Sequence, residues 1–343
     1  MSAVQILMFE LDIETNESFR LESGLVLDGI KLRASVYGRL NDDKSNAVLV
    51  FHALTGSSRI HEWWPDLVGE GRALDTSQNA VICVNYIGSC YGSTPAEEIE
   101  SVVTTRDIVR SQVKVLEHLG IRKLRAVVGG SVGGMLALQL AADHPDLTEK
   151  CIAIGATPLS AMGLALNHIQ RRALDIENGV HLARQLATIS YKSAEAFDER
   201  FARNPNRNGE RPHERFDSRF DIAGYLDYQG DVFTKRFEPA SYRLITKAMD
   251  LFDLTDDEIA RIKAKVSLIG ISSDWLFPAA DVLRLANRLY ANDVDAEYID
   301  FESPDGHDAF LSDTTGMSRV LKGIFNNHAA WPPAEYRVKQ FAA

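Results

Sequence analysis

Short and almost continuously apolar runs recur along the chain, and segments with a helical pattern separate them. Runs of this kind are typical of strands that are buried on both faces of a parallel sheet. The helical patterns are at residues 105–119, 135–144, 278–289 and 315–325. Strands that alternate with helices predict an α/β fold with a mostly parallel, doubly wound sheet. The apolar runs are residues 47–51, 80–85, 126–130, 151–155, 266–271 and 296–301.

Two regions depart from this alternation. Near the N-terminus, residues 6–13 and 25–37 alternate apolar with polar side chains, which predicts an antiparallel hairpin at the sheet edge. Residues 158–262 are helical and charged, and they predict an inserted helical cap over the carboxyl ends of the strands. The core of the fold is then expected in two parts, 1–157 and 263–343.

One turn motif predicts a nucleophile. The sequence Gly129-Gly130-Ser131-Val132-Gly133-Gly134 lies between an apolar run and a helical pattern. Glycines two positions before and after the serine allow the sharp turn that a Cβ would obstruct. Such a turn holds the serine hydroxyl clear of the sheet, beside the N-terminus of the following helix. Ser131 is therefore the expected nucleophile.

A serine hydroxyl needs a general base, and that base needs a carboxylate to orient it. Asp274 directly follows the run at 266–271, and His307 lies in a loop after the run at 296–301. The order serine, aspartate, histidine is the chain order of α/β-hydrolase triads. We predict His307 as the base and Asp274 as the residue that orients it.

Each of these residues also has a simpler explanation by itself. Gly-x-Ser-x-Gly arises by chance, Asp274 could cap the helix that begins near Pro278, and His307 could be a surface histidine. The three in this order, each after a predicted strand, favour a triad.

An oxyanion hole needs two backbone donors, and we predict the amides of Leu54 and Val132 for this role.

Longer motifs lie in residues 52–57, 63–64, 88–94, 105–110, 129–135, 225–230, 271–278 and 303–310. They resemble the homoserine O-acetyltransferase family of α/β-hydrolase proteins, and the resemblance covers most of residues 47–326. The resemblance implies two-step acyl transfer, with acetyl-CoA as the donor substrate and no bound cofactor. It also implies that Arg184, Tyr191 and Asp308 bind the amino acid. Arg184 and Tyr191 are seven residues apart, so on a helix they share one face. Members are commonly dimers through the cap helices, so a homodimer is expected.

The chain also departs from the family pattern near the predicted tunnel to the serine. Only residues 174–179 join two cap helices where usual members have a longer segment, Pro95 to Glu98 replaces a common Gly-Pro pair, and Val132 replaces a usual methionine. A shorter cap would admit more water to an acyl-enzyme. An esterase that cleaves short acyl esters, especially acetates, is therefore the alternative function.

The composition and charge of the chain limit the kinds of molecule that it is expected to bind. The formal net charge of −11 argues against nonspecific binding to nucleic acid or to an anionic membrane. The chain has three cysteines without paired spacing, an acidic N-terminus and no apolar run long enough for a membrane span. We expect a cytoplasmic enzyme that acts on small molecules and needs no metal.

Overall fold

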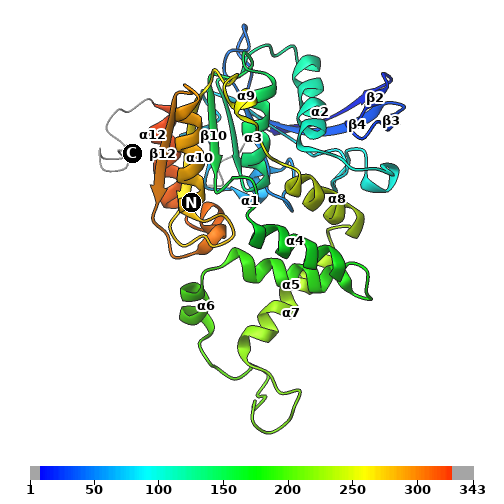
Figure 1. The fold of residues 1–343 in the computed structure, drawn as a ribbon, viewed down its shortest axis with the longest axis vertical. Coiled ribbons are helices and arrows are strands. Elements are labelled where there is room, and N and C mark those ends of the chain that lie inside the picture. The colour runs from blue at the N-terminus through cyan, green and yellow to red at the C-terminus, as the bar shows by residue number, and fades with distance from the viewer. Residues whose placement is uncertain (1–7, 327–343) are drawn as a thin grey trace.

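A computed structural model describes residues 8–326, and its centre is an eight-stranded sheet with the strand order β1-β4-β8-β5-β9-β10-β11-β12 (Figure 1). The strands from β8 to β12 in this order pair in parallel, and β1 and β4 complete one edge in antiparallel fashion. The predicted α/β sheet is confirmed. The strands are β1 (Met8–Thr15), β4 (Ile30–Tyr37), β5 (Ala47–Phe51), β8 (Ala80–Val84), β9 (Ala126–Gly130), β10 (Lys150–Ile154), β11 (Lys265–Ile271) and β12 (Ala296–Phe301).

The predicted edge hairpin is present with different limits. Strand β1 pairs with β4 from Met8 opposite Tyr37 to Thr15 opposite Ile30. The second strand does not begin at residue 25, because Gly29 takes a positive φ of 91° and a Cβ there would lie 2.1 Å from a backbone oxygen. Residues 19–20 and 26–27 instead pair with each other as β2 and β3. Residues 6 and 7 of the predicted strand lie outside the described range.

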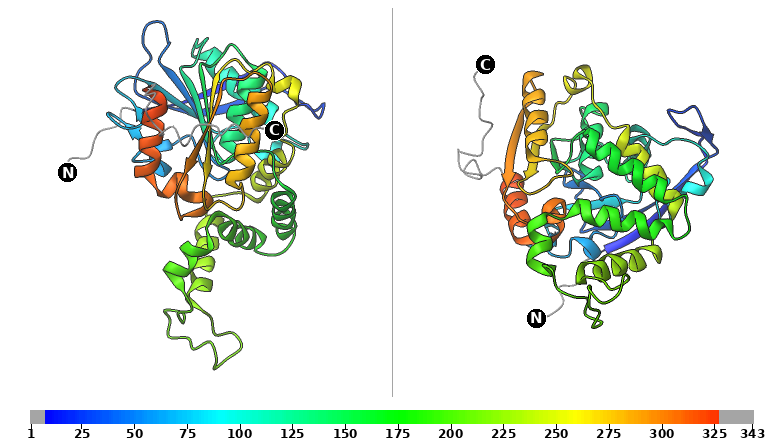
Figure 2. Two further views of the ribbon diagram at one scale, coloured as in Figure 1. Left: turned by 60° about the vertical axis from the view of Figure 1, so that its left-hand side comes forward. Right: turned by 60° about the horizontal axis from the view of Figure 1, so that its bottom comes forward.

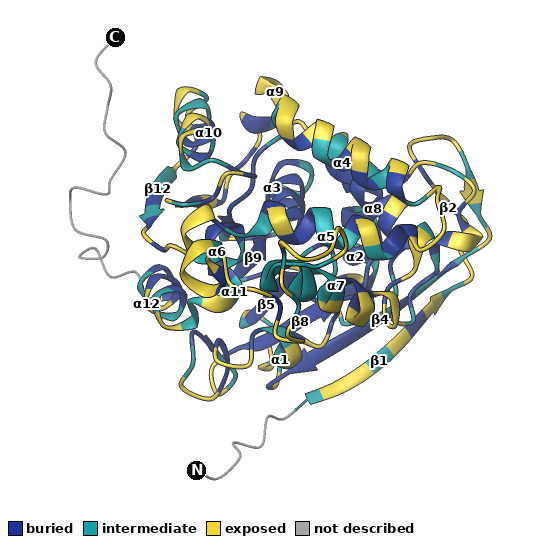
Figure 3. Ribbon diagram, turned by 90° about the horizontal axis from the view of Figure 1, so that it is seen from below, coloured by how far each residue is buried: buried dark blue, intermediate teal, exposed yellow. Residues whose placement is uncertain are grey.

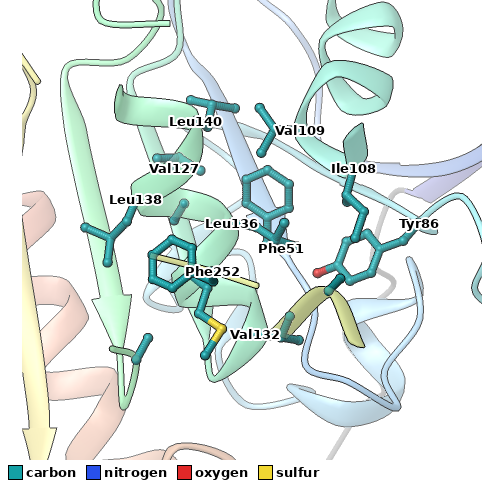
Figure 4. Close-up of a cluster of buried hydrophobic side chains, with 14 of the residues drawn as sticks. Phe51, Tyr86, Ile108, Val109, Val127, Val132, Leu136, Leu138, Leu140 and Phe252 are labelled. Atoms are coloured by element: carbon teal, nitrogen blue, oxygen red, sulfur yellow. The ribbon is translucent and has the colours of Figure 1, made fainter. Parts of the chain in front are cut away.

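Two hydrophobic clusters cover the two faces of the sheet, as alternation along its strands requires. Leu49 and Phe51 of β5 belong to one cluster, which includes side chains of α2 (Thr105–His118), α3 (Val132–Asp143) and α10 (Ala279–Ala291). Val48 and Val50 belong to the other, with side chains of α1 (Ile60–Trp63) and α12 (Thr314–Phe325). Helix α3 lies deepest, and Figure 4 shows its leucines packed around Phe51 and Phe252.

Five of the six helices between β10 and β11 lie beyond one end of the sheet (Figures 1 and 2). Helix α4 packs on α5 and α8, and α5 packs on α7. The segment from α6 to α7 projects furthest from the sheet (Figure 2). The five helices are α4 (Ala161–Ala173), α5 (Gly179–Tyr191), α6 (Ala194–Phe201), α7 (Asp221–Thr234) and α8 (Pro239–Asp250).

The chain returns from these helices to the sheet before residue 262. Helix α9 (Asp256–Ile259) contacts α3, and its Ile259 is fully buried in the first hydrophobic cluster. A capping box closes its N-terminus, because the Thr255 side chain accepts from the Glu258 amide and Glu258 accepts from the Thr255 amide. Within residues 8–326, no helix is long and apolar enough to cross a membrane.

Candidate active site

Ser131 lies at the apex of the turn between β9 and α3. Its φ of 59° and ψ of −129° are outside the regions that non-glycine residues normally adopt. Its amide donates to the Ile154 carbonyl at 2.9 Å, which holds the turn against β10. A Cβ on Gly129 would lie 2.1 Å from the Gly133 oxygen, so this close approach requires glycine. The local sequence thus forces the serine into its strained position.

His307 and Asp274 lie at the ends of neighbouring strands and are hydrogen bonded. The His307 Nδ1 to Asp274 Oδ2 distance is 2.6 Å, and both side chains are almost completely buried. The other oxygen of Asp274 accepts the amides of Leu276 and Phe277, each at 2.9 Å. Three hydrogen bonds therefore fix the carboxylate, and the carboxylate fixes the imidazole ring.

The electrostatics of His307 favour its protonated form. Burial alone would lower its pKa, but the negative charge and hydrogen bond of Asp274 outweigh burial, and Asp308 adds to their effect. The net result is a pKa above the ordinary value of 6.5. An imidazole of this kind can accept a proton and keep the resulting charge beside a carboxylate.

Ser131 and His307 line one cavity of about 630 Å³. Within the described residues, His307 Nε2 is buried and has no hydrogen-bond partner. The structure thus brings the two side chains to the same cavity without a hydrogen bond between them. Catalytic hydrogen bonds are often long or poorly aligned before the substrate binds. The unpartnered Nε2 of His307 is therefore consistent with a general base.

Leu54 lines the same cavity from the turn that follows β5. This turn is closed by the Gly56 amide, which donates to the Ala53 carbonyl at 2.9 Å. Val132 is the first residue of α3, and an amide at that position has no partner inside the helix. The oxyanion role of these two amides stays a prediction.

The three residues expected to bind an amino acid also line this cavity. The Arg184 guanidinium carbon lies 5.7 Å from the centre of the Tyr191 ring, and both side chains come from α5. Among residues 8–326, no carboxylate forms an ion pair with Arg184. Asp308 already has a partner, because Lys192 Nζ lies 3.2 Å from its Oδ2.

Sequence reasoning missed Lys192 and Arg236. Helix α5 ends at Tyr191, and the extended backbone of Lys192 (φ −111°, ψ 151°) leaves the helical spacing on which face arguments depend. Arg236 lines the cavity although it lies more than a hundred residues from Ser131 in the chain. No local pattern links these two positions. In the described part of the chain, no group of three His, Cys, Asp or Glu side chains could hold a metal ion.

Comparisons with known proteins agree with this geometry. A family profile described as the alpha/beta hydrolase fold matches residues 46–314. The homoserine O-acetyltransferase of Symbiobacterium thermophilum is 39% identical, over 85% of this chain and 88% of that protein. The enzyme of the same name from Methanosalsum zhilinae is 37% identical, over 91% of this chain and 71% of that protein. The chain belongs to the homoserine O-acetyltransferase family.

The solved structures that are similar to this member of the homoserine O-acetyltransferase family include both transferases and esterases. The homoserine O-acetyltransferase of Staphylococcus aureus is 26% identical with a TM-score of 0.79, covering 93% of this chain and 96% of that one. The acetyl esterase MekB is 25% identical with a TM-score of 0.76, covering 92% and 96%. One fold thus carries both reactions, and the side chains around the serine must distinguish them.

Proposed function

We propose that this protein transfers an acetyl group from acetyl-CoA to the hydroxyl of L-homoserine. The observation that carries the proposal is the set of side chains in one cavity: Ser131 and His307 share it with Arg184, Tyr191 and Asp308. An esterase for simple acetates has no need of a cation and an anion placed to hold an amino acid. The family membership supports the same reaction.

In the first half-reaction, His307 Nε2 takes the proton of Ser131 as the serine oxygen attacks the thioester carbonyl carbon. The amides of Leu54 and Val132 would stabilise the negative charge that develops on the carbonyl oxygen. The carbon–sulfur bond then breaks, and His307 returns the proton to the sulfur of CoA. Asp274 stabilises the imidazolium that forms in between.

In the second half-reaction, the hydroxyl of homoserine gives its proton to His307 and attacks the acyl carbon. The bond to Ser131 breaks, and His307 protonates the serine oxygen again. Arg184 would bind the substrate carboxylate through two parallel hydrogen bonds. The substrate ammonium would bind the carboxylate of Asp308, whose Oδ2 also contacts Lys192. Binding both ends of the amino acid places its hydroxyl at the acyl-enzyme.

The alternative is hydrolysis of short acyl esters on the same residues. The connection between α4 and α5 spans only residues 174–178, and Asp308 is already neutralised by Lys192. Both observations would favour water as the acceptor. The chemistry of the triad is the same for either acceptor.

One experiment separates the two functions. The protein is incubated with acetyl-CoA with and without L-homoserine, and free thiol and acetylated product are followed. Thiol release that requires homoserine supports transfer, whereas rapid cleavage of a small acetate ester with no use of acetyl-CoA supports the esterase. Arg184→Ala should raise the KM for homoserine about tenfold or more and leave ester cleavage largely intact. An equal loss of both activities would remove Arg184 from the amino-acid site.

We further propose that residues 158–262 act as a cap domain and that the protein is a homodimer through α4 and α5. Exposed apolar side chains on these helices support the second proposal, since an unpartnered apolar face is typical of an interface. Cytoplasmic residence is proposed because the three cysteines are free thiols. The exposed apolar side chains are Met162, Leu164, Ile169, Leu182 and Ile189, with Ile176 in the connection between the helices.

A further inference from the structure

Arg236 connects the cap helices to the turn that carries a proposed oxyanion donor. It lies between α7 and α8, and its Nη1 donates to the Thr55 carbonyl at 2.8 Å and to the Tyr91 hydroxyl at 3.1 Å. In the described part of the chain, no carboxylate forms an ion pair with Arg236. Its charge is thus directed at these two neutral oxygens in the wall of the active-site cavity.

The Thr55 carbonyl belongs to the turn of residues 53–56, and Leu54 is the other central residue of that turn. The turn follows β5 and is closed by one hydrogen bond, from the Gly56 amide to the Ala53 carbonyl. The Thr55 carbonyl shares one planar peptide unit with the Gly56 amide, and the Ala53 carbonyl shares another with the Leu54 amide. The hydrogen bond from Gly56 to Ala53 joins these two units, so holding the Thr55 carbonyl restricts the direction of the Leu54 amide. Arg236 is placed to restrict this rotation.

The second partner of Arg236 is held in a strained conformation. Tyr91 has a φ of 76°, which costs a non-glycine residue on the order of 1–2 kcal/mol. Its carbonyl accepts from Asn85 Nδ2 at 2.8 Å, and its ring packs against Phe237 with 6.5 Å between ring centres. Strain of this kind persists only where surrounding contacts determine it. These contacts place the Tyr91 hydroxyl within reach of Arg236.

The same region of the cap also supports the proposed amino-acid site. The guanidinium carbon of Arg236 lies 5.2 Å from the centre of the Phe233 ring, and that of Arg184 lies 5.1 Å from the same centre. Phe233 is almost completely buried, so it is a fixed support for both cations. The Phe233 ring thus contacts both Arg184, which is proposed to bind the acceptor, and Arg236, which contacts the oxyanion turn.

We propose that Arg236 is a positioning residue that fixes the oxyanion turn from the cap. It acts through the Thr55 carbonyl and does not itself contact the reacting atoms. The inference rests on the proposed function only in taking Ser131 as the nucleophile and Leu54 as an oxyanion donor. It extends that function by making the cap part of the acylation machinery as well as the site of the acceptor.

The test measures acylation alone, with p-nitrophenyl acetate as the acyl donor in a stopped-flow burst experiment. Arg236→Ala should lower the acylation rate constant about tenfold, the loss expected for one charge-assisted hydrogen bond at a partly exposed site, with KM changed less than about twofold. Arg236→Lys should recover part of the rate, because an ammonium can reach one of the two oxygens. Guanidinium ion added to Arg236→Ala should restore activity.

Two further variants make the result specific. Tyr91→Phe removes one partner and keeps the Thr55 bond, so its loss should be smaller than that of Arg236→Ala. Lys235→Ala changes a neighbouring exposed cation without a bond to the turn and should acylate at the normal rate. Unchanged acylation in Arg236→Ala, or a loss that neither lysine nor guanidinium reduces, would overturn the proposal. So would a rise in the KM for acetyl-CoA alone, since Arg236 would then bind the donor.

The outcome is separable from that of the proposed function. The ester reports the burst whether or not the enzyme uses acetyl-CoA or homoserine. A Ser131→Ala variant that still forms an acyl-enzyme contradicts Ser131 as the nucleophile, whereas a native burst that the Arg236 variants leave unaltered contradicts only the role of Arg236.

Discussion

At the scale of single residues, the site depends on Asp274, because hydrogen bonds engage both oxygens of its carboxylate. One of its oxygens binds His307, and the other accepts two backbone amides. A rotation that turned the carboxylate away from His307 would also break those two bonds. The tautomer of His307 is therefore set by Asp274, with the proton on Nδ1 and the lone pair of Nε2 free for Ser131.

Asp274→Asn tests this dependence. The amide oxygen can keep the bonds to Leu276 and Phe277, but the amide nitrogen then faces His307 Nδ1 and favours the wrong tautomer. We expect kcat to fall by about 10⁴-fold with little change in the melting temperature, as removal of the orienting charge does in serine proteases. Steady-state ester cleavage and thermal unfolding measure the two quantities. A variant with near-normal kcat would exclude Asp274 as the orienting group.

The effect of Asp308 on His307 predicts a pH dependence. His307 acts as a base only when neutral, so activity is lost as the pH falls through its raised pKa. Asp308 contributes to raising that pKa, so Asp308→Asn should lower it and move the acidic limb of the kcat/KM profile to lower pH. A small acetate ester is the right substrate, because it has no ammonium to bind. A limb that stays in place or moves to higher pH would contradict the assigned interaction.

At the scale of elements, the glycine turn and α3 form one rigid unit with β5. A Cβ on Gly133 would lie 2.3 Å from the Phe51 oxygen, and a backbone atom cannot move away as a flexible side chain can. Gly133→Ala should therefore lower the free energy of unfolding by about 3 kcal/mol, at the upper end of the usual cost of overpacking. Chemical denaturation measures it.

Gly224→Ala is the matched control for that variant. Gly224 lies inside α7, and a Cβ there would meet only the end of the Asn206 side chain, at 3.0 Å. Alanine also favours a helix over glycine by about 1 kcal/mol. The control should be neutral or more stable than the native protein. Equal destabilisation of the two variants would mean that the contact with β5 does not explain the effect.

The elements that the sequence predicted best are those whose signal is local. Buried parallel strands give continuous apolar runs, so β5, β9 and β11 could be predicted from the local apolar pattern alone. The limits of β4 were missed because Gly29 breaks the strand through its backbone conformation. The hydrogen bond from Arg236 to the Thr55 carbonyl could not be predicted from any local sequence pattern. It depends on how the segment between α7 and α8 packs against the turn after β5. Tertiary contacts of this kind are the part that a single sequence does not encode locally.

At the scale of the whole molecule, the cap presents two different surfaces. One surface holds Arg184 and Tyr191 against the cavity. The other carries exposed apolar side chains on α4 and α5. Figure 3 shows the helices of the cap from below, with their exposed positions in yellow. Met162 and Ile169 on α4 are seven residues apart, as are Leu182 and Ile189 on α5, so each pair shares a helix face. Exposed apolar side chains that gather on a surface are typical of an interface.

Ile169→Asp tests whether that surface joins two copies. Ile169 is 52% exposed in one chain, and in a twofold interface the substitution would place two carboxylates in or near an apolar contact. We expect sedimentation velocity to show a dimer for the native protein and a monomer for the variant. Tyr290→Asp is the matched control, since Tyr290 is similarly exposed at 56% but lies on α10, away from the cap. If both variants sediment as the native protein does, the apolar surface of α4 and α5 is not the dimer contact. Because Ser131, His307 and Asp274 belong to the same chain, the monomeric variant should still form an acyl-enzyme with p-nitrophenyl acetate.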